Sequence, residues 1–246
     1  MLSSIGDEGL LGLEEAAKRI LILVKDVLIN SNRKPTEPLA HLSLSLSGAD
    51  TEANQNELVN AIKDLCPNVA HEIHICNDSI GAFLTVCEKA AIVLISGTGS
   101  ICSYVRENLT FQRIGGYGHL LGDSGSVARN GDQLSKNVFH DAGVQLARHV
   151  RAALYYVVMD SVCENQNLTV VCCGSVFKSW DLMRDGFYEY LKPSNDDQWT
   201  GTLNLVQLKH SAAYGAARLS NYFDSKVIIP IDLSVQFDKV IFGVKF

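Results

Sequence analysis

The sequence predicts an α/β protein with two lobes, on the basis of three observations. The chain has 246 residues, of which 47% are hydrophobic and 20% charged, which suffices for a sizeable core and exceeds the common size of one domain. Segments that alternate apolar and polar residues, as strands do, are followed by segments with helical spacing. Glycine-containing turns follow three of the strand-like segments, and ligands in α/β folds gather at such strand ends.

The first lobe is expected over residues 1–90. Apolar residues from Leu13 to Leu28 recur at helical spacing and predict an amphipathic helix that ends before the polar stretch 30–38. Strict alternation over 42–47 predicts a strand that leads into a helix over 52–65. Alternation over 71–76 predicts another strand, followed by a helix over 79–89. The strand–helix step is thus repeated.

The second lobe is expected over residues 91–225. Strands over 92–95 and 101–105 flank a tight turn, and five glycines within 115–126 predict a loop with a special backbone. A long helix over 133–159, a buried strand over 169–173 and a helix over 180–191 follow. A strand over 203–208 and a helix of small residues over 210–220 complete this lobe. The tail 226–246 is expected to return to the first lobe.

Charge and cysteine content narrow the class of partner and the compartment. A formal net charge of −6 gives no basic patch for nucleic acid or an anionic membrane, so a small-molecule substrate is expected. The seven cysteines include no C-x-x-C pair, so most are expected to be buried free thiols. An acidic start and the lack of an apolar run of about 20 residues predict a cytoplasmic protein without a membrane span.

Local sequence supports two interpretations of the turn Ser96-Gly97-Thr98-Gly99-Ser100 about equally well. Its glycines expose backbone N–H groups and its hydroxyls add donors, as a phosphate cradle requires. A plain β-hairpin turn requires much the same glycines. The residues alone therefore make this turn a candidate ligand site without deciding its role.

Two aspartates are candidate catalytic residues, and each also has a structural interpretation. Asp78 follows a predicted strand, which suits a general base, but an aspartate that caps the next helix is an equally good interpretation. Asp123 carries the same ambiguity. The run Gly122-Asp123-Ser124-Gly125 is similar to the nucleophile loop of trypsin-like proteases, but the strand–helix alternation excludes that all-β fold.

Five motifs resemble, in family order, those of the eukaryotic N-acetylglucosamine kinases. They are LSLSG at 44–48, VLISGTGS at 93–100, GGYGHLLGD at 115–123, CGSVFKSW at 173–180 and KHSAAYGAA at 209–217. The resemblance runs from about residue 40 to residue 220. It implies membership of the BadF/BadG-type ATPases within the actin-like ATPase and sugar-kinase superfamily, whose two ribonuclease-H-like lobes surround a central cleft.

The resemblance also implies roles for single residues and an activity. Asp78 would be the catalytic base that accepts the proton of the sugar 6-hydroxyl as this attacks the γ-phosphate of ATP, with Mg²⁺ as the second cofactor. The residues implied in nucleotide binding are Gly97, Thr98, Gly99, Gly174 and Ser175. The residues implied in binding N-acetylglucosamine are Ser100, Gly116, Tyr117, Gly118 and Asp123. No protein-bound metal is implied, and a homodimer is left open.

Three departures from the family pattern leave a second function open. No strand and Gly-Gly-Gly-Thr phosphate turn occurs before Pro38, so the first lobe is expected to be incomplete. The segment between Ala128 and Gln133 is short, and Ile101 stands where the family has an asparagine that bonds the sugar. The alternative is a catalytically impaired, truncated relative that acts as a sugar-binding or interaction protein. The related activator ATPases of acyl-CoA dehydratases are disfavoured because no cysteine pair suits an iron–sulfur cluster.

Overall fold

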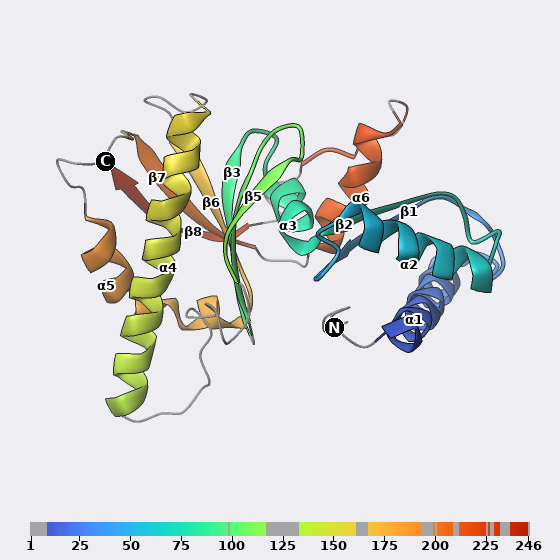
Figure 1. Cartoon of the computed structure of the whole chain (residues 1–246), viewed down its shortest axis with the longest axis horizontal. Coiled ribbons are helices and arrows are strands. Elements are labelled where there is room, and N and C mark those ends of the chain that lie inside the picture. The colour runs from blue at the N-terminus through green and yellow to red at the C-terminus, as the bar shows by residue number, and fades with distance from the viewer. Residues whose placement is uncertain are drawn as a thin grey trace. The chain divides into compact units, whose positions relative to one another are not determined.

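The computed structural model divides the chain into two compact units (Figure 1). Unit 1 comprises Met1–Thr85 and Ala212–Pro230, and unit 2 comprises Val86–Ser211 and Ile231–Phe246. The structure describes residues 9–97, 99–116, 133–160, 167–192, 199, 201–208, 212–224, 226, 229–231 and 237–245. Each unit is an α/β body with its own sheet and its own core. The predicted α/β class with two lobes is confirmed.

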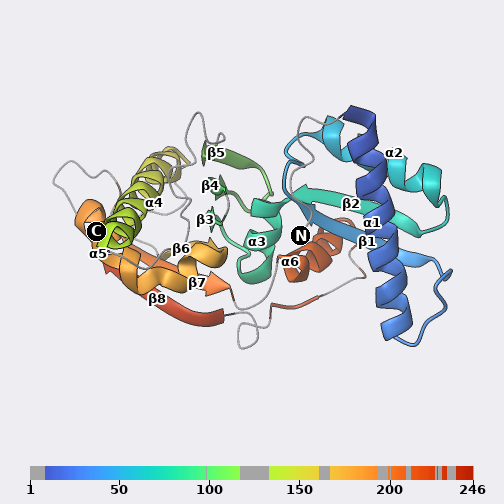
Figure 2. The ribbon, with the colours of Figure 1, turned by 90° about the horizontal axis from the view of Figure 1, so that it is seen from below.

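Unit 1 is built on two parallel strands. Its elements are α1 (Gly9–Asn30), β1 (Leu39–Leu46), α2 (Glu52–Leu65), β2 (Ala70–Asn77), α3 (Asp78–Val86), α6 (Ala213–Leu219) and the 3₁₀ turn η2 (Ser220–Tyr222). Leu42 pairs with Ile73 and Leu44 with Ile75, so each strand turns its aliphatic residues to one face of the sheet. That face packs with α1 and α2 around Ile20, Leu58 and Ile62. Figure 2 shows α1 and α2 beside this sheet.

The other face of the unit 1 sheet carries the polar residues of the same alternation. Ser43 and Ser45 of β1 lie on it, and α6 packs against β1 there. Helices α3 and α6 approach each other closely, because a Cβ added at Gly215 would lie 1.8 Å from the Gly81 carbonyl oxygen. A Cβ at Gly81 would in turn lie 2.0 Å from Ser45 Oγ. Glycine is therefore needed where these helices cross each other and the sheet.

Unit 2 is built on six strands in the order β5-β4-β3-β6-β7-β8. Its elements are β3 (Ala91–Ser96), β4 (Ser100–Val105), β5 (Phe111–Gly115), α4 (Gln133–Met159), β6 (Asn167–Cys173), the 3₁₀ turn η1 (Ser175–Ser179), α5 (Trp180–Leu191), β7 (Thr202–Leu208) and β8 (Phe237–Lys245). Strands β3, β4 and β5 form an antiparallel meander, β6 and β7 run parallel to β3, and β8 is antiparallel to β7. An antiparallel meander joined to parallel strands agrees with the ribonuclease-H-like lobe that the resemblance implies.

The core of unit 2 lies between its sheet and the helices α4 and α5 (Figure 2). Leu146 and Val150 of α4 and Phe187 of α5 are fully buried there. The two helices touch backbone to backbone, since a Cβ at Gly143 would lie 2.1 Å from the Met183 carbonyl oxygen. None of the described helices in either unit is both long enough and apolar enough to span a membrane.

The observed elements match most of the predicted ones. The prediction was incorrect in two regions, strand β5 and the C-terminal tail. The helices predicted over 52–65, 133–159 and 180–191 have those bounds in the structure. Strand β5 was not predicted, because its Gln112 and Arg113 break the apolar pattern of the short run. The tail prediction is wrong for its last strand, because β8 pairs with β7 in unit 2. The segment that returns to unit 1 is Ala212–Pro230, not 226–246.

Candidate functional site

Three chain turns meet at one edge of the unit 2 sheet, where β3 and β6 end. The first is the turn that joins β3 to β4, the second follows β5 at Gly116, and the third follows β6 at Gly174. Ser96 pairs with Ser100 across the first turn, and Ile95 pairs with Cys173 at the end of β6. The fold therefore gathers six of the predicted site residues in one place, namely Gly97, Gly99, Ser100, Gly116, Gly174 and Ser175.

Gly116 and Gly174 are required by the backbone geometry of this edge. Both have positive φ angles, 84° and 106°, which side chains rarely tolerate. A Cβ at Gly116 would lie 2.1 Å from the Ser100 carbonyl oxygen, and a Cβ at Gly174 would lie 2.0 Å from that of Ser96. Ser96 and Ser100 are themselves buried. These glycines let the second and third turns press directly against the first.

Gly97 is different, because the fold of the described residues does not require a glycine there. A Cβ at this position would meet no described atom within 4 Å. Its φ angle is outside the left-handed region, so another residue could adopt this backbone. The Gly97 amide nitrogen donates to the Gly99 carbonyl oxygen at 2.8 Å, which closes the turn. Among the described residues, none fills the space beside Gly97.

Arg113 and His149 support the second turn, and sequence reasoning missed both. Arg113, on β5, donates from Nε to the Gly115 carbonyl oxygen at 3.3 Å and from Nη2 to the Gly116 carbonyl oxygen. His149, on α4, packs so closely that a Cβ at Gly115 would lie 2.8 Å from its ring. Burial lowers the pKa of His149, so the ring is neutral near pH 7. Recognising β5 as a strand would have pointed to Arg113.

Unit 1 places three polar residues at the carboxyl ends of its two strands. Asp50 follows β1, Asn77 ends β2 and Asp78 begins α3. Asn77 is buried, its Nδ2 donates to Asp50 Oδ1 at 3.1 Å, and its Oδ1 accepts from the Ile80 amide at 2.9 Å. The residue that caps α3 is thus Asn77 rather than Asp78, which removes the capping interpretation of Asp78. Asp78 is partly exposed at this edge.

The remaining predicted residues, Thr98, Tyr117, Gly118 and Asp123, lie outside the described residues. Asp78 belongs to unit 1, whereas the described nucleotide and sugar candidates belong to unit 2. Sequence reasoning named Asp78 but missed its neighbours Asp50 and Asn77. The sequence carried a signal for both, because Gly48 follows one segment of strict alternation and Asn77 ends another.

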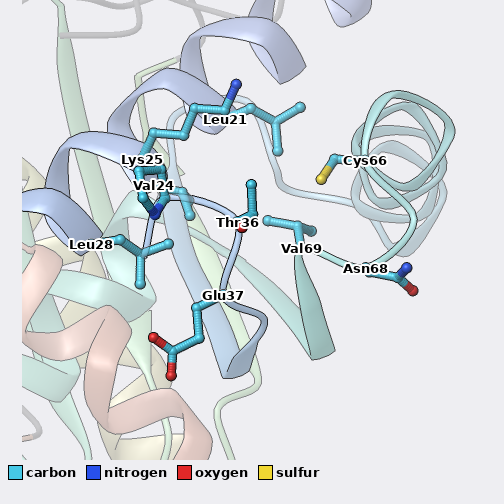
Figure 3. A pocket seen from close by; sticks show the side chains of 10 residues that line it. Leu21, Val24, Lys25, Leu28, Thr36, Glu37, Cys66, Asn68 and Val69 are labelled. Carbon is cyan, nitrogen blue, oxygen red and sulfur yellow. The ribbon is translucent and has the colours of Figure 1, made fainter. Parts of the chain in front are cut away.

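A small pocket in unit 1 holds none of these residues (Figure 3). Leu21, Val24 and Leu28 of α1 line one side, and Thr36 and Cys66 lie across from them. Its volume of 30 Å³ has room for about one water molecule but not for a sugar or a nucleotide. The turns at the sheet edges, and not this pocket, are therefore the candidate site.

Comparison with known proteins places the chain beside sugar kinases. No protein-family model matches the sequence. Over 114 residues the chain is 30% identical to an N-acetylmuramic acid/N-acetylglucosamine kinase of Clostridium acetobutylicum, a match that covers 46% of this chain and 37% of that relative. The chain therefore matches well under half the length of this curated relative.

Two solved structures have a similar fold. One, from Porphyromonas gingivalis, is described as a putative N-acetylglucosamine kinase. Its TM-score is 0.54 at 15% identity, and the match covers 85% of this chain and 86% of that one. The other, from Chromobacterium violaceum and described in the same way, has a TM-score of 0.52 at 17% identity, with coverage of 84% and 85%. The chain thus shares the α/β fold of these two structures, and its motifs and its partial match to the Clostridium kinase agree in pointing to sugar kinases.

Proposed function

We propose that this protein is a sugar kinase that transfers the γ-phosphoryl group of ATP to the 6-hydroxyl of N-acetylglucosamine. The observation that carries this proposal is the convergence of three glycine turns at the carboxyl edge of the unit 2 sheet. Phosphoryl transfer asks a protein mainly to position the reactants and to stabilise charge, and backbone N–H groups in such turns do both. The similarity to N-acetylglucosamine kinases supports the choice of sugar.

The residues of unit 2 supply the proposed binding functions. Gly97 and Gly99 form the turn that faces the phosphates: Gly99 offers its amide, and Gly97, whose own amide closes the turn, leaves the approach clear of a side chain. Gly174 and Ser175 line the nucleotide on the neighbouring strand end. Ser100 and Gly116 take part in holding the sugar. Thr98, Tyr117, Gly118 and Asp123 keep the roles that the resemblance implies. Mg²⁺ neutralises phosphate charge during the transfer.

Asp78 is the proposed general base. Because Asn77 provides the cap of α3, the Asp78 carboxylate is not needed for that task. In the reaction the sugar oxygen bonds to the γ-phosphorus, the bond from that phosphorus to the β-phosphate oxygen breaks, and the hydroxyl proton passes to the carboxylate. Asp50 supports the arrangement through its contact with Asn77.

The test is the release of ADP from MgATP by the purified chain in the presence of N-acetylglucosamine. Wild type should turn over, and Asp78→Asn should lower kcat by about 100-fold or more, since general-base catalysis contributes about that much. Asp64→Asn is the matched control, because Asp64 is an exposed aspartate near the end of α2. Equal turnover by wild type and Asp78→Asn would refute the role given to Asp78.

A second function, sugar binding without turnover, is favoured by two specific observations. Among the described residues the sheet of unit 1 has two strands, and no glycine phosphate turn belongs to it. Ile101 also lies beside Gly116, where its apolar side chain cannot bond a sugar hydroxyl. Calorimetric binding of N-acetylglucosamine without any ADP release would support this function over the first.

A further inference from the structure

Two histidines and a glutamate meet on the polar face of the unit 1 sheet. His41 lies on β1, and Glu72 and His74 lie on β2. The register pairs His41 with Glu72 and Ser43 with His74, so the three side chains leave the same face at neighbouring positions. All three residues belong to unit 1, so their arrangement is internal to one compact body.

The distances among their polar atoms match those of a metal coordination shell. His41 Nδ1 lies 3.3 Å from His74 Nε2 and 3.5 Å from Glu72 Oε2. His74 Nε2 lies 3.2 Å from the same carboxylate oxygen. Zinc binds imidazole nitrogen and carboxylate oxygen at about 2.0–2.2 Å in a tetrahedron, which places any two ligand atoms about 3.3–3.6 Å apart. The three atoms already have the spacing of one tetrahedral face.

Asp224 determines which nitrogen of His41 faces this cluster. Its Oδ2 lies 3.4 Å from His41 Nε2, on the side of the ring away from His74. A neutral ring that donates Nε2–H to a carboxylate carries its lone pair on Nδ1, which is the atom turned toward the cluster. Metal-ligating histidines generally donate their second N–H to a carboxylate or carbonyl in this way. Asp224 thus has the position of an orienting partner.

The ring of His74 is held in place by an aromatic stack. Phe223 stacks on its ring, with centroids 4.3 Å apart and an interplanar angle of 5°. Its side chain is 11% exposed, and burial lowers the pKa of His74 despite the opposing effect of Glu72. The charged or titratable groups around the ring are Glu72 and His41, with Asp224 beyond His41. The stack with Phe223 fixes the ring plane, and metal binding through Nε2 requires that this nitrogen carry no proton.

We propose that His41, Glu72 and His74 bind a Zn²⁺ ion, with Asp224 orienting His41. Two imidazoles and one carboxylate favour zinc over magnesium or calcium, which prefer oxygen ligands. Three protein ligands leave a fourth position for water. Through Asp224 the bound ion ties the segment after η2 to the sheet. No residue of the proposed kinase site takes part, so this proposal stands apart from that function.

The experiment measures Zn²⁺ binding to the full chain by calorimetry, after chelator treatment and with thiols kept reduced. Wild type should bind one equivalent at this site, and His41→Gln and His74→Gln should lose it. Asp224→Asn should weaken binding by about 10- to 100-fold, as loss of an outer partner does. His71→Gln is the matched control, since His71 is an exposed histidine of the same strand on the other face. It should bind zinc as wild type does.

Two further readouts keep the outcome clear. Co²⁺ bound at this site should give visible absorption without a thiolate charge-transfer band, which distinguishes it from the seven cysteines. Glu72→Gln serves if a histidine variant fails to fold, because the Glu72 side chain is 53% exposed and tolerates the change. It should bind zinc more weakly than wild type. Three results would each overturn the proposal. They are equal zinc affinity in wild type and the cluster variants, a thiolate band in the Co²⁺ spectrum, and no zinc binding by wild type.

Discussion

The sheets of the two units share a parallel strand pair but differ in what is added to it. In unit 2 the pair β6–β7 is extended by β3, β4 and β5 on one side and by β8 on the other. In unit 1 no other described strand pairs with β1 or β2. The pair alone suffices to place Asp50 and Asp78 at a carboxyl edge. The interlocked glycine turns at Ser96 and Ser100 exist only where the antiparallel meander is added.

The helices that cover the two sheets also differ, because those of unit 2 bury more apolar surface. In unit 2, α4 and α5 are pressed together at Gly143 and cover a core that includes both tryptophans, Trp180 and Trp199. In unit 1, α1 buries one stripe but leaves Leu23 and Val27 more than half exposed. We therefore expect unit 2 to be the more stable body and unit 1 to open first. Tryptophan fluorescence reports on unit 2 alone, since both tryptophans lie there.

The largest expected effect comes from adding a methyl group at a helix crossing in either unit. Gly143→Ala should destabilise unit 2 by about 2–3 kcal/mol, because its Cβ would lie 2.1 Å from a backbone oxygen. Gly215→Ala should do the same in unit 1, where the Cβ would lie 1.8 Å from the Gly81 oxygen. Denaturant unfolding followed by tryptophan fluorescence should shift for Gly143→Ala. Hydrogen exchange in β1 and β2 should rise for Gly215→Ala.

The opposite result would contradict the difference in stability between the two units. A fluorescence midpoint lowered equally by both variants would show that the units unfold together, and the contrast in stability drawn from their sheets would then be wrong.

A smaller effect is expected from the cap at the carboxyl edge of unit 1. Asn77→Ala removes the acceptor for the Ile80 amide and the donor to Asp50, and loss of a cap typically costs about 1 kcal/mol. Exchange of amides in α3 should quicken while tryptophan fluorescence is unchanged. Asn77→Ser keeps a capping oxygen and brings no second carboxylate toward Asp50, so it should protect α3 amides better than Asn77→Ala. Equal exchange in wild type and Asn77→Ala would contradict the capping role.

The pH dependence of unit 2 should carry the signature of one buried histidine. Burial holds the pKa of His149 below its ordinary value near 6.5, and its Nδ1 has no hydrogen-bond partner among the described residues. The unfolded chain then binds more protons below about pH 6.5, so the stability of unit 2 falls as the pH drops through and below that value. His149→Leu should flatten this dependence in fluorescence-monitored unfolding, whereas His71→Gln should not. An unchanged slope in His149→Leu would show that other groups cause it.

The smallest expected effect concerns the exposed side of α1. Val27→Lys replaces a side chain that is 61% exposed, so unit 1 should change in stability by less than about 0.5 kcal/mol. Hydrogen exchange of α1 amides provides the measurement, and Leu28→Lys on the buried side is the destabilising comparison. A large loss in Val27→Lys would mean that this side of α1 is covered in solution.

Local sequence predicted the elements whose patterns are long or strict. The bounds of α2, α4 and α5 followed from helical spacing sustained over several turns, and β1 and β2 followed from strict alternation. Strand β5 was missed because five residues with two polar ones carry little periodicity, and its identity depends on pairing with β4. The partner of β8 was likewise set by long-range pairing with β7, which no local pattern encodes.

The candidate site was predictable to a similar extent. The glycine motifs marked the edge of the unit 2 sheet, but the support from Arg113 and His149 depends on tertiary contacts. Local sequence left Asp78 as either a general base or the cap of α3. In the structure Asn77 caps α3, which leaves the general-base role for Asp78 as the proposal. The polar residues that alternate along β1 and β2 were interpreted only as signs of strands, although the same alternation builds the polar face that carries His41 and His74.

The central claim is that the turn between β3 and β4 cradles the phosphates of a nucleotide, and Gly97→Ala tests it most directly. Because a Cβ at Gly97 meets no described atom within 4 Å, the variant should fold with unchanged tryptophan-monitored stability. Calorimetry with MgATP should show binding to wild type that is weakened in Gly97→Ala, since the methyl group would occupy the approach to the turn. Glu107→Ala, in the exposed turn at the other end of β4, should bind as wild type does. Equal MgATP affinity in wild type and Gly97→Ala, or no binding by wild type, would contradict the claim and leave the turn a plain hairpin.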